Sequence, residues 1–311
     1  MKNFALVGSA GYIAPRHMSA IKDVGGHLIA SYDPKDSVGI IDSYFPNSYF
    51  FTEFERFDRF IDKCQRKSNF IDIISICSPN YLHDSHIRFA LRSGTDVICE
   101  KPLVLNPWNI EPLIQYEKDF GKKVNTILQL RLHPSIIELK KKIDDYENSQ
   151  IYDVDLTYIT SRGNWYLQSW KGDEKKSGGI ATNIGIHFFD MLHHLFGSLK
   201  QNIVTHRDIT KASGYLEYQK ARVRWYLSID HSDIPIHIRE TGVRTYRSIK
   251  LNGKDFEFSS GFSDLHKKSY LEILKNKGFG LEDNRAAIET VSEIRTSEIR
   301  SISDYHPFLK K

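Results

Sequence analysis

MKNFALVGSAGYIAPRHMSAIKDV, residues 1–24, carries the strongest indication of the fold of this chain. Residues 1–7 are mostly apolar and predict a short buried strand. Residues 8–11 form a glycine turn, and residues 12–24 predict the helix that leaves it. A strand, a glycine turn and a helix in this order are typical of a unit that binds a dinucleotide.

The role of a glycine turn in binding a dinucleotide explains its residue types. Gly8 and Gly11 let the backbone approach a pyrophosphate, and the N–H groups at the start of the helix, at Tyr12 and Ile13, would then face it. The turn has one residue more between its first two small positions than the usual G-x-G-x-x-G pattern. The strand before it and the helix after it still favour a pyrophosphate site made by these four residues.

An acidic residue follows at the end of the second predicted strand, residues 27–32. Asp33 comes after Gly11 at close to the spacing of about 20 residues at which a carboxylate meets the adenosine ribose. Its charge would accept hydrogen bonds from both ribose hydroxyls and repel a 2′-phosphate, although the nearby Lys35 acts in the opposite direction. We therefore expect the cofactor to be NAD rather than NADP.

Strands and helices continue to alternate as far as residue 125. The predicted strands are residues 48–51, 70–77 and 96–99, and the predicted helices are residues 54–64, 81–92 and 109–120. This alternation predicts an α/β Rossmann domain, a doubly wound parallel sheet, over residues 1–125, with ligands at the carboxyl ends of the strands. Ser78, Asn80, Glu100 and Lys101 fall at such ends, so we expect them to contact the cofactor.

The pattern changes after residue 126. Residues 151–160, 214–218, 221–230, 246–251 and 255–258 predict strands, and residues 182–196, 264–275 and 283–300 predict helices. Asn252 and Gly253 form a two-residue hairpin signal. We expect residues 126–311 to form an α+β domain on a mostly antiparallel sheet that binds substrate. A sheet covered by helices on one face favours a homo-oligomer through the other face.

Length and charge limit the partners. The 311 residues suffice for two domains, and 43 basic against 39 acidic residues give a net charge of only +4. This mild charge favours a small anionic substrate over nucleic acid. There is no signal peptide pattern and no apolar run of about 18 residues, so we expect a cytoplasmic protein with no membrane partner.

Two groups of residues are candidates for catalysis. Lys101 becomes a useful base if its pKa falls, which burial beside a positively charged nicotinamide ring would cause; the alternative is a surface lysine in a turn. On a helix, Asn183, His187 and Asp190 share one face and could present a carboxamide and an imidazole to a pocket. The alternative for this helix is a histidine that is merely hydrogen-bonded.

We expect no metal ion. His187 and Asp190 with His193 or His194 are conceivable ligands, but Asn183 stands where a further carboxylate would be wanted. The three cysteines form no pair with metal-ligand spacing.

These motifs together resemble the glucose-fructose oxidoreductase and inositol dehydrogenase family of two-domain NAD(P)-dependent sugar oxidoreductases, over nearly the whole chain. The shared motifs are Ser78-Pro79-Asn80 with the following His83, Glu100-Lys101-Pro102, and Gly178-Gly179 with Asn183-Ile184-Gly185-Ile186-His187-Phe188-Phe189-Asp190. The resemblance adds His83 to the cofactor-binding residues and implies that Lys101, as first candidate, and His187 are the acid/base groups. The usual aspartate of the family is Asn183 here, so one carboxylate proton partner is lost.

Residues 77–83, 127–131 and especially 158–173, YITSRGNWYLQSWKGD, are similar to one branch of this family. That branch oxidises C3 of UDP-N-acetyl-2-amino-2-deoxy-D-glucuronate for bacterial surface polysaccharide, lipopolysaccharide O-antigen. Cationic and amide side chains after a strand suit a sugar nucleotide with two phosphates and a carboxylate, and Arg162 and Lys171 are the preferred anion contacts. The alternative is an aromatic loop that packs on the sheet. The expected substrate-binding residues are Lys101, Arg131, Arg162, Asn164, Trp165, Lys171, Asn183 and His187.

The resemblance also implies a homotetramer and 2-oxoglutarate as acceptor of the hydride from NADH. Three other functions remain open: a dehydrogenase of a different sugar or inositol, an NAD-dependent glycosidase, and a non-catalytic NAD(H)-binding regulator. A substrate without phosphates would leave Arg162 and Lys171 unused, a glycosidase would show no net NADH, and a regulator would not need Lys101.

Overall fold

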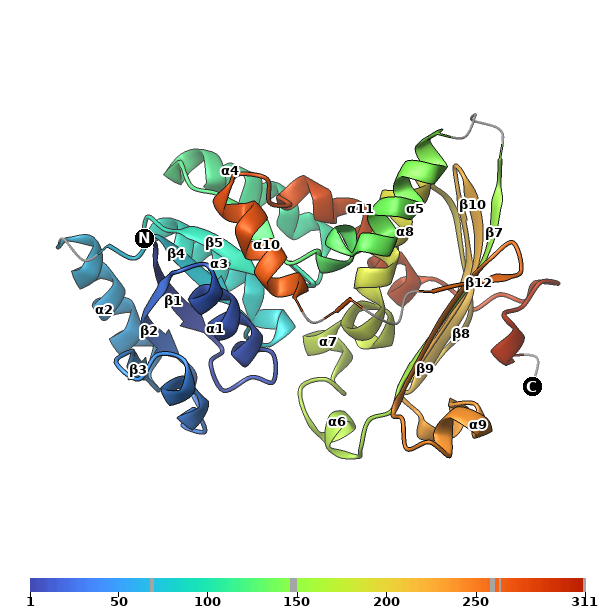
Figure 1. Ribbon diagram of the computed structural model, residues 1–311, viewed down its shortest axis with the longest axis horizontal. Helices are drawn as coiled ribbons and strands as arrows, with labels where there is room; N and C mark the ends of the chain where they lie inside the picture. The colour runs from blue at the N-terminus through green and yellow to red at the C-terminus, as the bar shows by residue number, and fades with distance from the viewer. Residues whose placement is uncertain (68–69, 146–149, 258–260, 263, 310–311) are drawn as a thin grey trace. The chain divides into compact units, whose positions relative to one another are not determined.

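The computed structural model describes residues 1–67, 70–145, 150–257, 261–262 and 264–309. The chain forms two compact units (Figure 1): unit 1 is Met1–Gln129 with Ser263–Arg285, and unit 2 is Leu130–Phe262 with Ala286–Lys311. The domain bounds expected from the sequence, 1–125 and 126–311, stay a prediction. The structure adds a late segment of the chain to the first unit, which no pattern in the sequence indicated.

Unit 1 is built on a six-stranded parallel sheet with the order β3-β2-β1-β4-β5-β6. This order and direction confirm the doubly wound sheet. Almost every residue of the central strands β1, β4 and β5 is buried, because helices cover both faces of the sheet. The bounds are β1 Asn3–Val7, β2 His27–Tyr32, β3 Tyr49–Phe51, β4 Ile73–Ile76, β5 Asp96–Cys99 and β6 Val124–Thr126.

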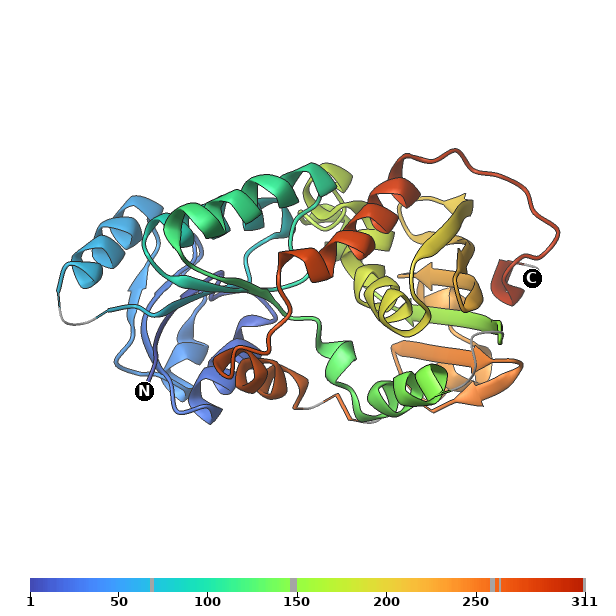
Figure 2. The same ribbon diagram turned by 90° about the horizontal axis from the view of Figure 1, so that it is seen from above.

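The helices of unit 1 lie in two layers. Figure 2 shows α1 and α10 on one face of the sheet and α3 and α4 on the other. The late helix α10 belongs to the core, since its Tyr270 and Ile273 are buried in one apolar cluster with Phe4 and Met18. The bounds are α1 Ala14–Asp23, α2 Phe54–Gln65, α3 His83–Arg92, α4 Ile110–Phe120 and α10 Leu265–Leu274.

Unit 2 contains a second six-stranded sheet with the order β12-β11-β7-β10-β9-β8. Of the strand pairs that the described residues form in this sheet, β7 with β10 is parallel and the other four are antiparallel, so the expectation of a mostly antiparallel sheet is confirmed. Asn252 and Gly253 have positive φ angles of 51° and 77° between β11 and β12, as the hairpin signal requires. The expected last strand residue, Phe258, lies outside the described residues. The bounds are β7 Tyr152–Thr160, β8 Leu199–Arg207, β9 Lys211–Tyr218, β10 Ala221–Ser228, β11 Thr245–Leu251 and β12 Lys254–Phe256.

The second sheet is covered on both faces. Figure 1 shows α5 and α8 on one face and the C-terminal segment on the other. Phe189 of α8 packs on Trp225, and His306 stacks on the next strand residue, Tyr226, because successive residues point to opposite faces. The face that the sequence left for another subunit is therefore partly covered by the chain itself. The helices are α5 Pro134–Asp145, α6 Trp165–Gln168, α7 Glu174–Ser177, α8 Ile186–Phe196, α9 Ile236–Arg239 and α11 Leu281–Thr296.

None of the helices among the described residues is long and apolar enough to cross a membrane.

The burial of His306 predicts a pH-dependent stability. Burial, and the nearby Arg224 guanidinium, lower the pKa of His306 to about 3. Because the folded pKa lies below the ordinary value of 6.5, the unfolded chain binds this proton more readily. The contribution of His306 is complete above pH 6.5 and is lost as the pH falls toward 3, at up to about 1.4 kcal/mol per pH unit.

We expect the urea midpoint to fall as the pH is lowered through this window. In the variant His306→Gln, which cannot take up the proton, the fall is shallower. Urea titrations of both proteins at several pH values measure the difference. Parallel curves for the two proteins would contradict the assignment.

Candidate active site

The glycine turn packs directly against the end of a neighbouring strand. Gly8 has a φ of +92°, and a Cβ atom on it would lie 2.5 Å from the backbone nitrogen of Ser78 and 2.6 Å from the carbonyl carbon of Cys77. The N–H of Gly11 donates to the carbonyl of Gly8 at 3.0 Å and closes the turn. Only glycine combines this backbone conformation with this close approach.

The start of α1 offers donors to an anion. The N–H groups of Tyr12 and Ile13 immediately precede the first helical residue, Ala14, and within the described residues they donate to no protein acceptor. The N-terminus of a helix carries a partial positive charge. These two donors and the glycine cradle fit the pyrophosphate of a dinucleotide.

Asp33 links the end of β2 to this turn. Its Oδ2 accepts from the N–H of Ala10 at 3.0 Å, and its Oδ1 accepts from the N–H of Lys35 at 2.9 Å. These bonds fix the orientation of the carboxylate, and each oxygen keeps a second lone pair for a ribose hydroxyl. The position and charge of Asp33 fit the adenosine ribose of NAD.

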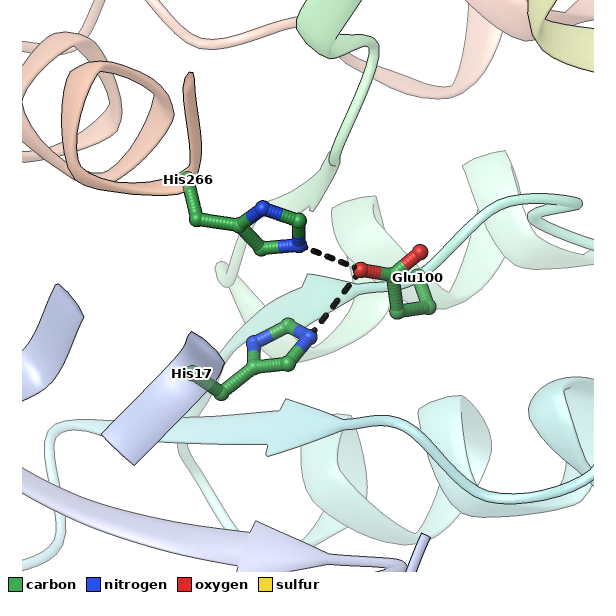
Figure 3. Close-up of side chains that lie close together, drawn as sticks. All are labelled: His17, Glu100 and His266. Carbon is green, nitrogen blue, oxygen red and sulfur yellow. Dashed lines mark hydrogen bonds and ion pairs between the residues drawn. The ribbon is translucent and has the colours of Figure 1, made fainter. Parts of the chain in front are cut away.

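A buried carboxylate at the end of β5 collects hydrogen bonds from two other parts of unit 1 (Figure 3). The Oε1 of Glu100 accepts from the Nε2 of His17 at 3.2 Å and from the Nε2 of His266 at 2.8 Å. Its Oε2 accepts from the N–H of Lys101 at 3.2 Å. Burial would raise the pKa of Glu100, but the bonds from both histidines hold it well below its usual range. The group is therefore a carboxylate.

Among the described residues, His17, Glu100 and His266 also form a group whose ligand atoms lie within 4.8 Å of one another. A His₂Glu set can bind a divalent ion such as zinc. Both imidazoles, however, point at a single carboxylate oxygen at hydrogen-bond distances. Two N–H···O bonds account for this geometry.

His83 and Glu100 both direct polar atoms at protein groups, and their contact with the cofactor stays a prediction. Both ring nitrogens of the buried His83 face backbone carbonyls, Nδ1 that of Pro102 at 2.7 Å and Nε2 that of Ser78 at 2.8 Å. Both carboxylate oxygens of Glu100 are engaged as described above. These side chains hold the turns after β4 and β5 in place, because their polar atoms are directed at protein groups.

The other expected residues of unit 1 lie where the sequence placed them. Ser78 and Asn80 are buried just after β4, and Ser78 Oγ lies 2.9 Å from His86 Nδ1. Lys101 is partly exposed directly after β5, and its peptide bond to Pro102 is cis. Contact of Ser78, Asn80 and Lys101 with a ligand stays a prediction.

In unit 2, the segment around Asn183 is not the α-helix that the sequence predicted. Ala181–Gly185 forms a π-helical turn, and α8 begins only at Ile186. Asn183 therefore lies in the π-helical turn, while His187 and Asp190 lie in α8. That the three side chains share one face stays a prediction. The side-chain amide of Asn183 donates to the hydroxyl of the buried Tyr166. Burial raises the pKa of Tyr166. His187 is half-buried, with its ring edge against Tyr158.

Asp190 is paired with a cation from the segment before α5. Its carboxylate forms a bidentate ion pair with Arg131, with Nη2 2.7 Å from Oδ1 and Nε 3.1 Å from Oδ2. The side chains are 2% and 11% exposed, respectively. The pair anchors α8 to the segment before α5. Contact of Arg131 with substrate stays a prediction.

The loop after β7 carries the other expected substrate residues. Arg162, Asn164 and Trp165 are exposed. The Lys171 ammonium lies 4.1 Å from the ring centroid of Trp170 and 5.9 Å from that of Trp165. A cation held over indole rings is partly desolvated, which strengthens its attraction to an anion.

Four residues of these networks carry no signal in the sequence: His17, His266, Tyr270 and Tyr166. All four are buried and make their polar contacts across long sequence separations. Periodicity gives no signal for such pairings.

The parallel sheet, its glycine turn, the donors at the start of α1 and the carboxylate after β2 define a protein with a dinucleotide-binding unit. Comparison with known families makes this specific. The model for an oxidoreductase family with an NAD-binding Rossmann fold matches residues 2–127, and the model for the C-terminal alpha/beta domain of the same family matches residues 140–238. The chain belongs to this family of glucose-fructose oxidoreductases and inositol dehydrogenases, and its cofactor is NAD.

Known relatives cover very different shares of the chain. The WlbA (WbpB) dehydrogenase from Thermus thermophilus, solved with NAD and alpha-ketoglutarate, is 50% identical with a TM-score of 0.95, over 99% of this chain and 100% of that one. The same enzyme solved with NAD and UDP-GlcNAcA is 49% identical at the same TM-score and coverage.

Two curated relatives match over shorter stretches. Inositol 2-dehydrogenase from Rhizobium meliloti (strain 1021) is 31% identical over 41% of this chain. D-glucoside 3-dehydrogenase from Escherichia coli (strain K12) is 26% identical over 40%. The chain spans 37% and 36% of the length of these two proteins.

Gly8→Ala tests the glycine cradle against a matched control. Gly25 also has a positive φ, of +72°, but nothing lies within 4 Å of the position of its Cβ. Both alanine variants lose about 1–2 kcal/mol to backbone strain at a positive φ. Only Gly8→Ala also displaces the end of β4, so we expect NAD+ affinity to fall at least about tenfold in Gly8→Ala. Titration calorimetry with NAD+ measures this, and equal dissociation constants for the two variants would refute it.

The buried pair of Arg131 and Asp190 predicts a stability pattern. Asp190→Asn leaves the guanidinium buried without its counter-charge, so we expect a loss of about 3–5 kcal/mol in the free energy of unfolding. Replacing both partners, as Arg131→Met with Asp190→Leu, recovers most of that loss. Denaturant titrations compare the two. A double variant less stable than the single one would show that the ion pair is not the cause.

Proposed function

We propose that the protein oxidises the C3 hydroxyl of UDP-N-acetyl-2-amino-2-deoxy-D-glucuronate, UDP-GlcNAcA, to the 3-keto sugar nucleotide with NAD+. The observation that carries this proposal is the similarity over the whole chain to the Thermus thermophilus WlbA dehydrogenase, whose structures contain NAD and UDP-GlcNAcA. The position of oxidation is supported by the name of the relative that is a glucoside 3-dehydrogenase.

Unit 1 supplies the residues for the cofactor. When bound, NAD+ accepts the hydride that leaves C3. Gly8 and Gly11 shape the cradle, the N–H groups of Tyr12 and Ile13 donate to the pyrophosphate, and Asp33 accepts from the ribose. Ser78 and Asn80, buried after β4, are the further cofactor contacts in this proposal.

The hydroxyl proton of C3 needs an acceptor as the hydride leaves. Lys101 is the first candidate, because it follows the strand end that the Glu100 network holds, and His187 is the second. Either the amine or the imidazole takes the proton, so that the C3–O bond becomes a carbonyl as the C3–H bond breaks. Asn183, held by Tyr166, is a carboxamide that can orient the substrate but cannot take the proton.

Unit 2 supplies the residues for the sugar nucleotide. Arg162 and Lys171 are proposed to meet its phosphates and carboxylate, since both are cations in the loop after β7. Asn164 and Trp165 lie in the same loop. Arg131 contributes through Asp190 by anchoring α8, which carries His187.

The proposal extends to the fate of NADH. Alpha-ketoglutarate is bound with NAD in the Thermus thermophilus enzyme. In this chain, 2-oxoglutarate would take the hydride from NADH and a proton, giving 2-hydroxyglutarate and NAD+. A cytoplasmic homotetramer that serves lipopolysaccharide O-antigen synthesis completes the proposal.

The test is an oxidation assay. Purified protein is mixed with NAD+ and UDP-GlcNAcA, with and without 2-oxoglutarate, and the sugar and 2-hydroxyglutarate are identified by mass. We expect a sugar nucleotide lighter by two hydrogens, and Lys101→Met lowering kcat by at least about 10²-fold. A control titration checks that Lys101→Met still binds NAD+.

Other outcomes separate the rival functions. Turnover of free inositol or glucose but not of the nucleotide sugar would identify a different dehydrogenase. Cleavage without net oxidation would identify a glycosidase. NAD+ binding with no chemistry on any of these sugars would indicate a regulator.

A further inference from the structure

The cluster around Glu100 joins three segments of unit 1 that are far apart in sequence (Figure 3). His17 comes from α1, Glu100 follows β5, and His266 comes from α10. We propose that His17 and His266 form a two-donor clamp on Glu100, and that Glu100 is thereby a positioning residue for Lys101. This inference rests on the proposed function, because it concerns the lysine that is its first candidate for the base.

The hydrogen bonds of the clamp offset the free-energy cost of burying the charge of Glu100. A buried carboxylate without donors is strongly unfavourable, and its two oxygens accept several hydrogen bonds. At Glu100, Oε1 takes both imidazole N–H groups, and Oε2 takes the backbone N–H of Lys101. Helices α1 and α10 therefore fix the position of the Glu100 carboxylate, and the carboxylate in turn fixes the backbone of Lys101.

The direction of each hydrogen bond around His17 can be worked out. Because Nε2 donates to Glu100, a neutral His17 has Nδ1 as acceptor, and the hydroxyl of Tyr270 at 2.8 Å is its donor. The hydroxyl of Ser75, 2.7 Å from that of Tyr270, then donates to Tyr270. Burial lowers the pKa of His17 and raises that of Tyr270 well above its usual value, which agrees with a neutral ring and a hydroxyl donor.

The chain Ser75–Tyr270–His17–Glu100 thus runs in one donor direction and ends at the Glu100 carboxylate, which also accepts from the backbone N–H of Lys101. Tyr270 and His266 both belong to α10. The late segment of the chain therefore contributes His266, which donates to Glu100, and Tyr270, which donates to His17. Because His266 and Tyr270 complete the hydrogen bonds of Glu100 and His17, α10 packs with the first unit.

Kinetics with matched variants tests the positioning role. His266→Leu removes one donor, whereas His266→Gln keeps an N–H donor of similar reach. We expect His266→Leu to lower kcat about ten- to hundredfold with a KM for NAD+ changed less than about threefold, and His266→Gln to recover most of kcat. His306→Leu, which replaces another buried histidine outside the cofactor unit, is expected to lose stability but keep kcat.

Equal kcat values for the Leu and Gln variants at position 266 would overturn the proposal. So would a loss of kcat in His306→Leu as large as in His266→Leu, since general destabilisation would then explain both. If His266→Leu does not fold, Tyr270→Phe, which deletes a single hydroxyl, takes its place, and a kcat equal to that of the wild type overturns the proposal.

A measurement without turnover separates this inference from the proposed function. Nitrogen-15 NMR of histidine-labelled protein at neutral pH reports which ring nitrogen of His17 is protonated. We expect Nε2 to carry the proton and Nδ1 to be an acceptor whose resonance moves in Tyr270→Phe. An Nε2 that carries no proton overturns the clamp. A wild-type protein that fails to oxidise UDP-GlcNAcA but shows this pattern would refute the proposed function and leave the clamp standing.

Discussion

The fold of the first unit depends on the hydrogen bonds that compensate the charge of one buried carboxylate. Glu100 sits at the end of β5 with its charge removed from water, and the donors that make this possible come from α1, from α10 and from the backbone of Lys101. A fold that lost any of them would leave a polar group unsatisfied in the interior. The need for these donors ties a segment late in the chain to a sheet made by the first 126 residues.

In the second unit, an ion pair compensates the charge of a buried carboxylate. Asp190 in α8 is almost fully buried and is met by the guanidinium of Arg131 through two hydrogen bonds. In both units a carboxylate of a family motif faces protein donors, while the neighbouring residues, Lys101 and His187, are only partly buried. The motifs therefore combine an anchoring acid with a group that is accessible for chemistry.

Local patterns in the sequence predicted most of the fold. The alternation of strands and helices predicted the parallel sheet because each strand and helix has its own periodicity, and Asn252-Gly253 predicted its hairpin because few residues adopt positive φ. The π-helical turn at Asn183 could not be predicted, since its letters fit an α-helix equally well. The His17 and His266 contacts depend on residues more than 80 positions from Glu100, which no local pattern encodes.

In the proposed reaction, the hydride on C3 of the sugar nucleotide passes to NAD+. This transfer is tested most directly by single turnover with UDP-GlcNAcA deuterated at C3, followed by denaturation of the protein and mass analysis of the released nicotinamide cofactor. We expect the deuterium in the reduced cofactor and a sugar product that has lost it. Deuterium retained in the sugar, with the cofactor still oxidised, would contradict this transfer.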